Sequence, residues 1–120
     1  MLKISIIASL LALPCLAAAD ARIHVSTDIV TWDAPTTEVQ CLAKGQAAIV
    51  AIDPKLSVVK AGHAAIATKD AWVFAVDCLQ SYKLNGAYVT LVYTGTKPDD
   101  YDKAKTALSK GLGGNSELYK

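Results

Sequence analysis

The fold of this 120-residue chain is decided by residues 72–94, WVFAVDCLQSYKLNGAYVTLVYT. Two runs rich in β-branched and aromatic residues flank Asn85-Gly86, which is the strongest short-range signal for a β-hairpin. Both central residues of a type I′ turn need a positive φ, which Asn tolerates and Gly adopts freely. A two-residue loop would place Cys78 opposite Tyr93. We therefore predict a hairpin of strands 72–84 and 87–94.

This pairing divides the side chains of the hairpin between two faces, because successive residues of a strand point to opposite sides. The face that we predict to be core collects Trp72, Phe74, Val76, Cys78, Tyr82, Leu84, Ala87, Val89, Leu91 and Tyr93. The opposite face is mixed in polarity and collects Val73, Ala75, Asp77, Leu79, Ser81, Lys83, Tyr88, Thr90, Val92 and Thr94. A slip of one residue would exchange the two faces, so the hydrophobic pattern specifies the register.

Residues 1–19 have the pattern of a secretory signal peptide. Lys3 precedes an apolar run at 4–16, and three alanines precede Asp20, the expected first residue after cleavage. The run is short for a membrane anchor, which needs about 20 apolar residues, and Pro14 interrupts it. We expect residues 20–120 to form one secreted, extracellular domain.

The mature chain would be close to electrically neutral. Removal of Lys3 leaves 11 of the 12 lysines and arginines, against 11 aspartates and glutamates. This balance gives no electrostatic reason to expect nucleic acid or a membrane surface as a partner of the mature form. We expect the partner to be another protein.

Two cysteines remain after cleavage, Cys41 and Cys78, and an even pair in an exported protein predicts a disulfide. Closing a loop of about 38 residues should stabilise the fold by about 4 kcal/mol on the chain-entropy model. Two buried free thiols are the alternative.

Two structures compete for residues 38–52. As a helix, they place one stripe on a single side, formed by Cys41, Leu42, Gly45, Ala48, Ile49 and Ile52. As a hairpin, residues 39–41 and 48–50 would pair around Lys44-Gly45, and the fold would become a β-sandwich. We favour the helix, because its stripe brings Cys41 to the packing side, where Cys78 could meet it.

The remaining elements complete an α+β domain with an antiparallel sheet and two packed helices. Strands are expected near 22–32 and 56–60, and residues 61–70 are undecided between a short helix and an irregular crossover. A second helix is expected at 98–110, because Pro98 and acidic residues suit its first turn and Gly111 can end it. Its apolar stripe contains Tyr101, Ala104 and Leu108.

Few residues suggest chemistry. His24 and His63 are the two groups that titrate near neutrality unaided, and together they could serve a small secreted nuclease, although no spacing links them. Asp99, Asp100 and Asp102 complement a helix dipole and do not follow a calcium-loop pattern. We expect no metal, no cofactor and no catalytic constellation.

The mixed face is the candidate binding surface, with Val73, Leu79, Tyr88 and Val92 as its apolar members. Either helix 98–110 covers this face through Tyr101 and Leu108, or the face is exposed and suits a protein partner. We favour the first outcome, in which helix 98–110 covers the mixed face, because the helix must bury its apolar stripe on one face of the sheet or the other. In format the chain resembles small secreted fungal effectors and killer toxins. We therefore expect a non-enzymatic, effector- or toxin-like binding protein, with a secreted hydrolase of the nuclease type as the alternative.

Overall fold

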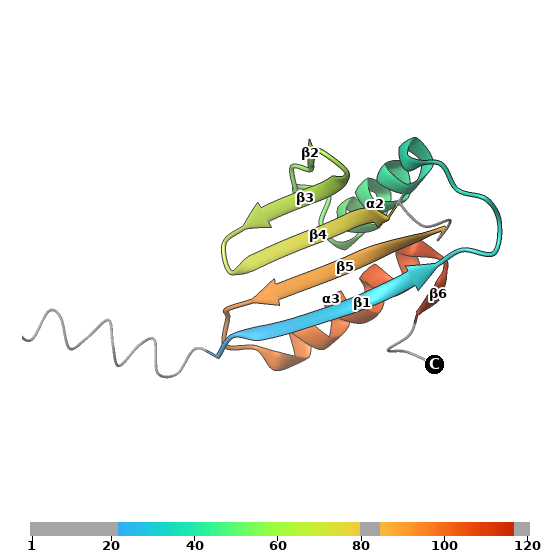
Figure 1. Cartoon of the computed structure of the whole chain (residues 1–120). Coiled ribbons are helices and arrows are strands. Elements are labelled where there is room, and N and C mark those ends of the chain that lie inside the picture. Colours follow the sequence, from blue (N-terminus) through green and yellow to red (C-terminus); the bar gives the residue numbers. More distant parts are fainter. Residues whose placement is uncertain (1–21, 80–84, 117–120) are drawn as a thin grey trace, which may run out of the picture.

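Six antiparallel strands and two helices make up residues 22–79 and 85–116, the part of the chain that the computed structural model describes (Figure 1). The elements are β1 (His24–Thr31), α2 (Glu38–Ile52), β2 (Val59–Ala61), β3 (Ala64–Lys69), β4 (Trp72–Leu79), β5 (Gly86–Tyr93), α3 (Pro98–Leu112) and β6 (Asn115–Ser116). The strand order in the sheet is β2-β3-β4-β5-β1-β6. The α+β prediction is confirmed, and the alternative β-sandwich is wrong.

Both helices lie on one side of the sheet, behind it in Figure 1, and the core fills the space between these layers. The most deeply buried large side chains come from both layers: Phe74, Ile49, Leu91, Leu108, Leu112, Val30 and Val76. The hairpin face that was predicted to be core is therefore the face beneath the helices. No helix in the described residues is both long and apolar enough to cross a bilayer.

Helix α2 forms where the sequence predicts it. Thr37 accepts a hydrogen bond from the Gln40 amide, and the Gln40 side chain accepts one from the Thr37 amide, which completes a capping box. Of the six residues in the predicted stripe, Cys41, Leu42, Gly45, Ala48 and Ile49 are buried, and Ile52 is half-buried. Gly45 allows the close approach to β4, because a Cβ there would lie 3.0 Å from the Val76 Cβ.

The disulfide between Cys41 and Cys78 is present, with Cα atoms 6.0 Å apart, and it joins α2 to β4.

Helix α3 runs two residues beyond its predicted end. Gly111 was expected to stop it, but the helix continues to Leu112, and Gly113 provides the left-handed cap with φ 67°. Gly111 instead packs against α2, because a Cβ at this position would lie 2.9 Å from the Ala48 Cβ. Either glycine could end the helix. Gly111 stays within α3 because it packs against α2, and Gly113 therefore forms the cap.

The hairpin has a different register from the predicted one. Trp72, not Cys78, lies opposite Tyr93, and Leu79 lies opposite Gly86. Gly86 is a strand residue, and positive φ among the described residues is confined to Gly62, Asp70 and Gly113. The type I′ turn at Asn85-Gly86 is therefore wrong. The predicted positions at 80–84, among them Tyr82 and Leu84, lie outside the described residues.

Neighbouring strands explain this register. Strand β5 pairs along its full length with β1 as well as β4, and β4 begins directly after a tight turn from β3, in which Lys69 lies opposite Trp72. These longer-range pairings override the local preference of Asn-Gly. The register shift of six residues, from Cys78 to Trp72, is even, so every described side chain keeps its predicted face.

The two less certain segments are both strands. Residues 61–70, left undecided, form a turn at Gly62 and then β3, whose Ala65 and Ala67 are buried against the helices. The strand expected at 56–60 begins later, at Val59, because Leu56 is buried in the connection after α2.

Candidate interaction surface

No element of residues 22–79 and 85–116 covers the side of the sheet away from the helices, and we call this side the open face. The register and the alternation of each strand place on it Val25, Thr27, Ile29, Val59, Ala61, Ala64, Ile66, Thr68, Val73, Ala75, Asp77, Tyr88, Thr90 and Val92. The expected cover by α3 is wrong. Tyr101 and Leu108 are buried on the other side, because the core face is wide enough to take both helices and α3 packs there beside α2.

Cross-strand pairing arranges the open face in rows that run across the strands. The three rows over β1, β5 and β4 are Val25–Val92–Val73, Thr27–Thr90–Ala75 and Ile29–Tyr88–Asp77. With strands about 4.8 Å apart and about 3.3 Å per residue, the face from β2 to β1 covers roughly 400 Å². The largest apolar patch on a typical monomeric protein is of this order, about 300–600 Å², and is often functional. The open face includes threonines and Asp77 besides its apolar residues.

Large apolar side chains on this face are exposed to solvent. Val25 is 57% exposed, Ile29 39%, Val59 62% and Tyr88 40%. Single exposed apolar residues are ordinary on a protein surface, but a concentration of them on one flat face is not. The open face is therefore a surface from which a partner could displace water at a gain in free energy.

The open face carries one charge. Asp77 is the single charged side chain among its described residues, and it lies opposite Tyr88 and Ala64 on the neighbouring strands. Its side chain is exposed and has no hydrogen bond or ion pair within the described part of the chain. A partner that covers Asp77 without offering a donor or cation would bury a charge at considerable cost.

The structure brings together three of the four residues proposed from the sequence. Val73 and Val92 are half-buried neighbours on adjacent strands, and Tyr88 is exposed one row away. Leu79 ends β4 opposite Gly86, and its side chain lies outside the described residues. The sequence analysis missed Val25 and Ile29, because their partner strand could not be identified from sequence alone. The alternation of Ile23 and Val25 was the available signal.

The two histidines lie at opposite corners of the sheet. His24 starts β1 opposite Tyr93. His63 directly precedes β3, three strands away, and its carbonyl accepts a hydrogen bond from the Cys78 amide of β4. Three strand spacings and six residues along the strands separate them by roughly 25 Å. Acid–base groups must both reach the same substrate, so this arrangement removes the basis for a nuclease that pairs the two histidines.

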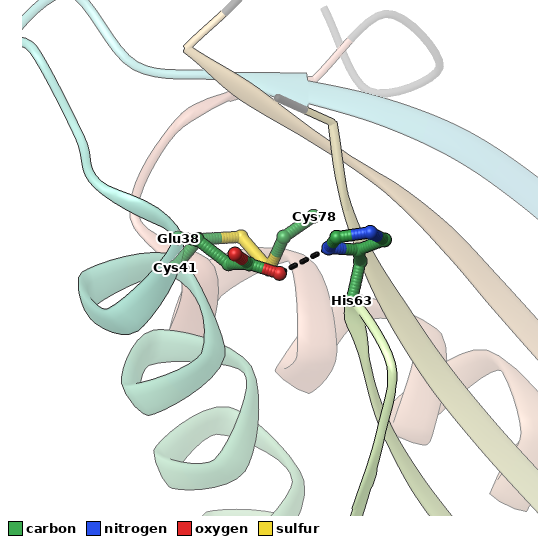
Figure 2. A network of polar contacts seen from close by, with 4 residues as sticks. All are labelled: Glu38, Cys41, His63 and Cys78. Atoms are coloured by element: carbon green, nitrogen blue, oxygen red, sulfur yellow. Dashed lines mark hydrogen bonds and ion pairs between the residues drawn. A yellow bond between two sulfur atoms is a disulfide. The ribbon is translucent and has the colours of Figure 1, made fainter. Parts of the chain in front are cut away.

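His63 has a structural contact instead (Figure 2). Its Nδ1 lies within hydrogen-bonding distance of Glu38 Oε1, which joins the turn between β2 and β3 to the first turn of α2 beside the disulfide. The hydrogen bond that protonated His63 donates to Glu38, the charge of Glu38 and the charge of Asp77 raise the pKa of His63 above its ordinary value. The contact links the N-terminal end of α2 to the turn between β2 and β3, and the His63 side chain is still 70% exposed.

The raised pKa of His63 predicts a pH-dependent stability. A group whose pKa is higher in the folded state stabilises that state fully below the unfolded pKa, about 6.5 for His, and loses the contribution as pH rises through the folded value. We expect the thermal midpoint of the wild type to fall more between about pH 5.5 and about pH 8.5 than that of His63→Gln. Equal falls in the two proteins would show that the contact with Glu38 contributes no proton-linked stability.

Comparison of the chain with family models, with curated proteins and with solved structures finds no match in any of the three. Functional inference therefore depends on the geometry of the chain itself.

Proposed function

We propose that this chain is an exported, non-enzymatic binding protein that attaches to another protein through its open face. The observation that carries the proposal is a flat sheet face of Val, Ile, Thr and Tyr that both helices leave uncovered. A soluble domain of this size can bury such a face under its own helices, as it does on the other side of the sheet. Leaving the face exposed has a cost in solubility that a binding role would explain.

The single charge on the described open face, Asp77, indicates what kind of surface the partner would present. Asp77 lies beside Tyr88, so a matching surface would be apolar and flat and would carry one basic side chain opposite Asp77. A second copy of this chain fits less well, because the described residues of its open face bring another Asp77 and no cation. Tyr88 is the expected anchor, since Tyr is enriched among residues that dominate binding energy.

The expected location agrees with this function. The Cys41–Cys78 disulfide supports export, because disulfides persist mainly in oxidising compartments. In an exported setting the partner would be a protein of a host or of a competing organism, as the effector- or toxin-like format suggests. N-terminal sequencing of the protein from an exporting expression host should give Asp20 as the first residue. A product that retains Met1 would contradict export by cleavage.

Site-specific cross-linking tests the binding face directly. The protein would carry a photoreactive residue at Thr90, in the centre of the open face, or at Ala47, which is exposed on α2. Illumination in extracts of candidate target cells should give a covalent adduct with another protein from position 90 and not from position 47. Adducts of equal yield from both positions would contradict the proposal, as would a cross-linked dimer of this chain.

The adduct identifies the partner, and affinity measurements then test the anchor. We expect Tyr88→Ala and Val25→Asp each to raise the Kd at least tenfold, because hot-spot truncations cost about 2 kcal/mol or more. Ala47→Asp, on the helix side, should change the Kd less than about twofold. Asp77→Lys should weaken binding more than Asp77→Asn, since it sets two cations against each other. Unchanged affinity in Tyr88→Ala and Val25→Asp would place the interface elsewhere.

A further inference from the structure

A pocket of about 430 Å³ lies on the helix side of the sheet, away from the open face. The last turn of α2, residues 100–107 of α3, and Trp72 and Phe74 of β4 line it, and it is open to solvent on one side. Its volume lies within the range of sites that hold small organic ligands. We infer that this pocket binds a small amphipathic cation, an apolar ring that carries an ammonium group. This inference does not depend on the proposed function of the open face.

Aromatic side chains give the pocket a rigid apolar wall. The ring of Trp72 stacks with Phe74 at 5.5 Å between centroids and lies 4.1 Å from the ring of Tyr93. Phe74 is buried and Trp72 is half-buried, so the stack is fixed by the core while part of the indole faces the pocket. An aromatic edge held in this way favours the face of a ligand ring, in the tilted geometry that aromatic pairs prefer.

Small side chains keep the space open. The helices touch where Gly111 meets Ala48, and the residues that line the pocket from the helices include three alanines, Ala51, Ala104 and Ala107. A leucine at any of these positions would project into the space. The pocket therefore exists because α2 and α3 contact each other closely at Ala48 and Gly111, while the alanines of both helices that line the pocket leave space beside that contact.

Charges around the pocket favour a cation. Its lining includes Asp53, Asp70 and Asp100, against Lys69 and Lys103. Lys69 Nζ lies 3.2 Å from Asp53 Oδ2, so these two charges neutralise each other. Asp70 and Asp100 then outnumber Lys103 by one negative charge. Asp70 lies in the turn between β3 and β4 with φ 52°, and it is exposed at the rim of the pocket.

Two probes with the same ring and opposite charge test the inference. Phenethylammonium and 3-phenylpropionate would be titrated into the oxidised protein, and the indole N–H of Trp72 followed by NMR. We expect saturable shifts with the cation, at a Kd in the millimolar range for so small a ligand, and at least fivefold weaker binding of the anion. Asp70→Asn, which the left-handed backbone tolerates, should bring the two affinities closer together.

A matched pair of variants tests the location. Ala107→Leu fills the pocket from the exposed side of α3 and should abolish the shifts at Trp72. Ala47→Leu adds the same atoms on the exposed side of α2, outside the pocket, and should leave the Kd within about twofold. Equal affinity for the two probes, no saturable shift at Trp72, or wild-type binding by Ala107→Leu would each overturn the inference.

Discussion

Replacing both cysteines, in Cys41→Ala/Cys78→Ala, is expected to lower the free energy of unfolding by about 4 kcal/mol. The bridge closes a loop with a sequence separation of 37 and links the first turns of α2 to the end of β4. Without it, the unfolded chain regains the conformational entropy that this loop had lost. Urea unfolding at equilibrium, with the wild type in parallel, would measure the difference.

This expected decrease is a large part of the total free energy of unfolding. Small domains are stable by about 5–15 kcal/mol, so the variant would retain little of that stability. The two alanines also remove buried sulfur atoms, and the wild type treated with a thiol reductant controls for this change in packing. A decrease below about 1 kcal/mol in both proteins would mean that the bridge does not constrain the unfolded chain as the entropy model requires.

The variant Gly86→Val is expected to lose about 2 kcal/mol. A Cβ at Gly86 would lie 2.9 Å from the carbonyl oxygen of Val30 and 3.3 Å from Thr31 Cγ2 on β1. The backbone oxygen is held in the ladder between β1 and β5 and cannot move aside cheaply. Two further methyl groups increase the crowding. The cost arises from contact between strands, because Gly86 does not need a positive φ.

Thr90→Val is the matched control for this variant. It places the same side chain on the same strand and the same face, and it should change stability by less than about 0.5 kcal/mol. Thermal and urea unfolding of both variants would distinguish the effect of the position, Gly86, from the effect of introducing valine into β5. Wild-type stability in Gly86→Val would contradict the pairing of Gly86 with Thr31 at this end of the sheet.

Local signals predicted much of this fold. The stripe through Cys41 and Gly45 defines the buried side of α2, and the pair of cysteines predicts the disulfide. These features depend on residues close in sequence or on a single pairing. Alternation also assigned the described hairpin residues, 72–78 and 87–93, to the correct faces, because an even shift of register does not exchange them.

Longer-range contacts determined the rest. The register of β4 and β5 follows from their pairing with β3 and β1, and no local signal at Asn85-Gly86 reports those contacts. Strand β3 has the sequence AAIATK, in which three alanines dilute the strand signal of its two β-branched residues, Ile66 and Thr68. Helix α3 could have covered either face by its own stripe, and its packing beside α2 decides which face stays open. The candidate surface was therefore recognised only in part, through Val73, Tyr88 and Val92.

Solvent accessibility of the methyl groups tests most directly whether the open face is free to bind. A soluble gadolinium chelate would be added to the labelled, oxidised protein, and the extra relaxation measured by NMR. We expect strong relaxation at Val25, Val73 and Val92 and weak relaxation at Val76, Val89 and Leu91, which alternate with them across the same strands. Methyl groups of Val73 and Val92 as protected as those of Leu91 would show that the face is covered, and would contradict the account.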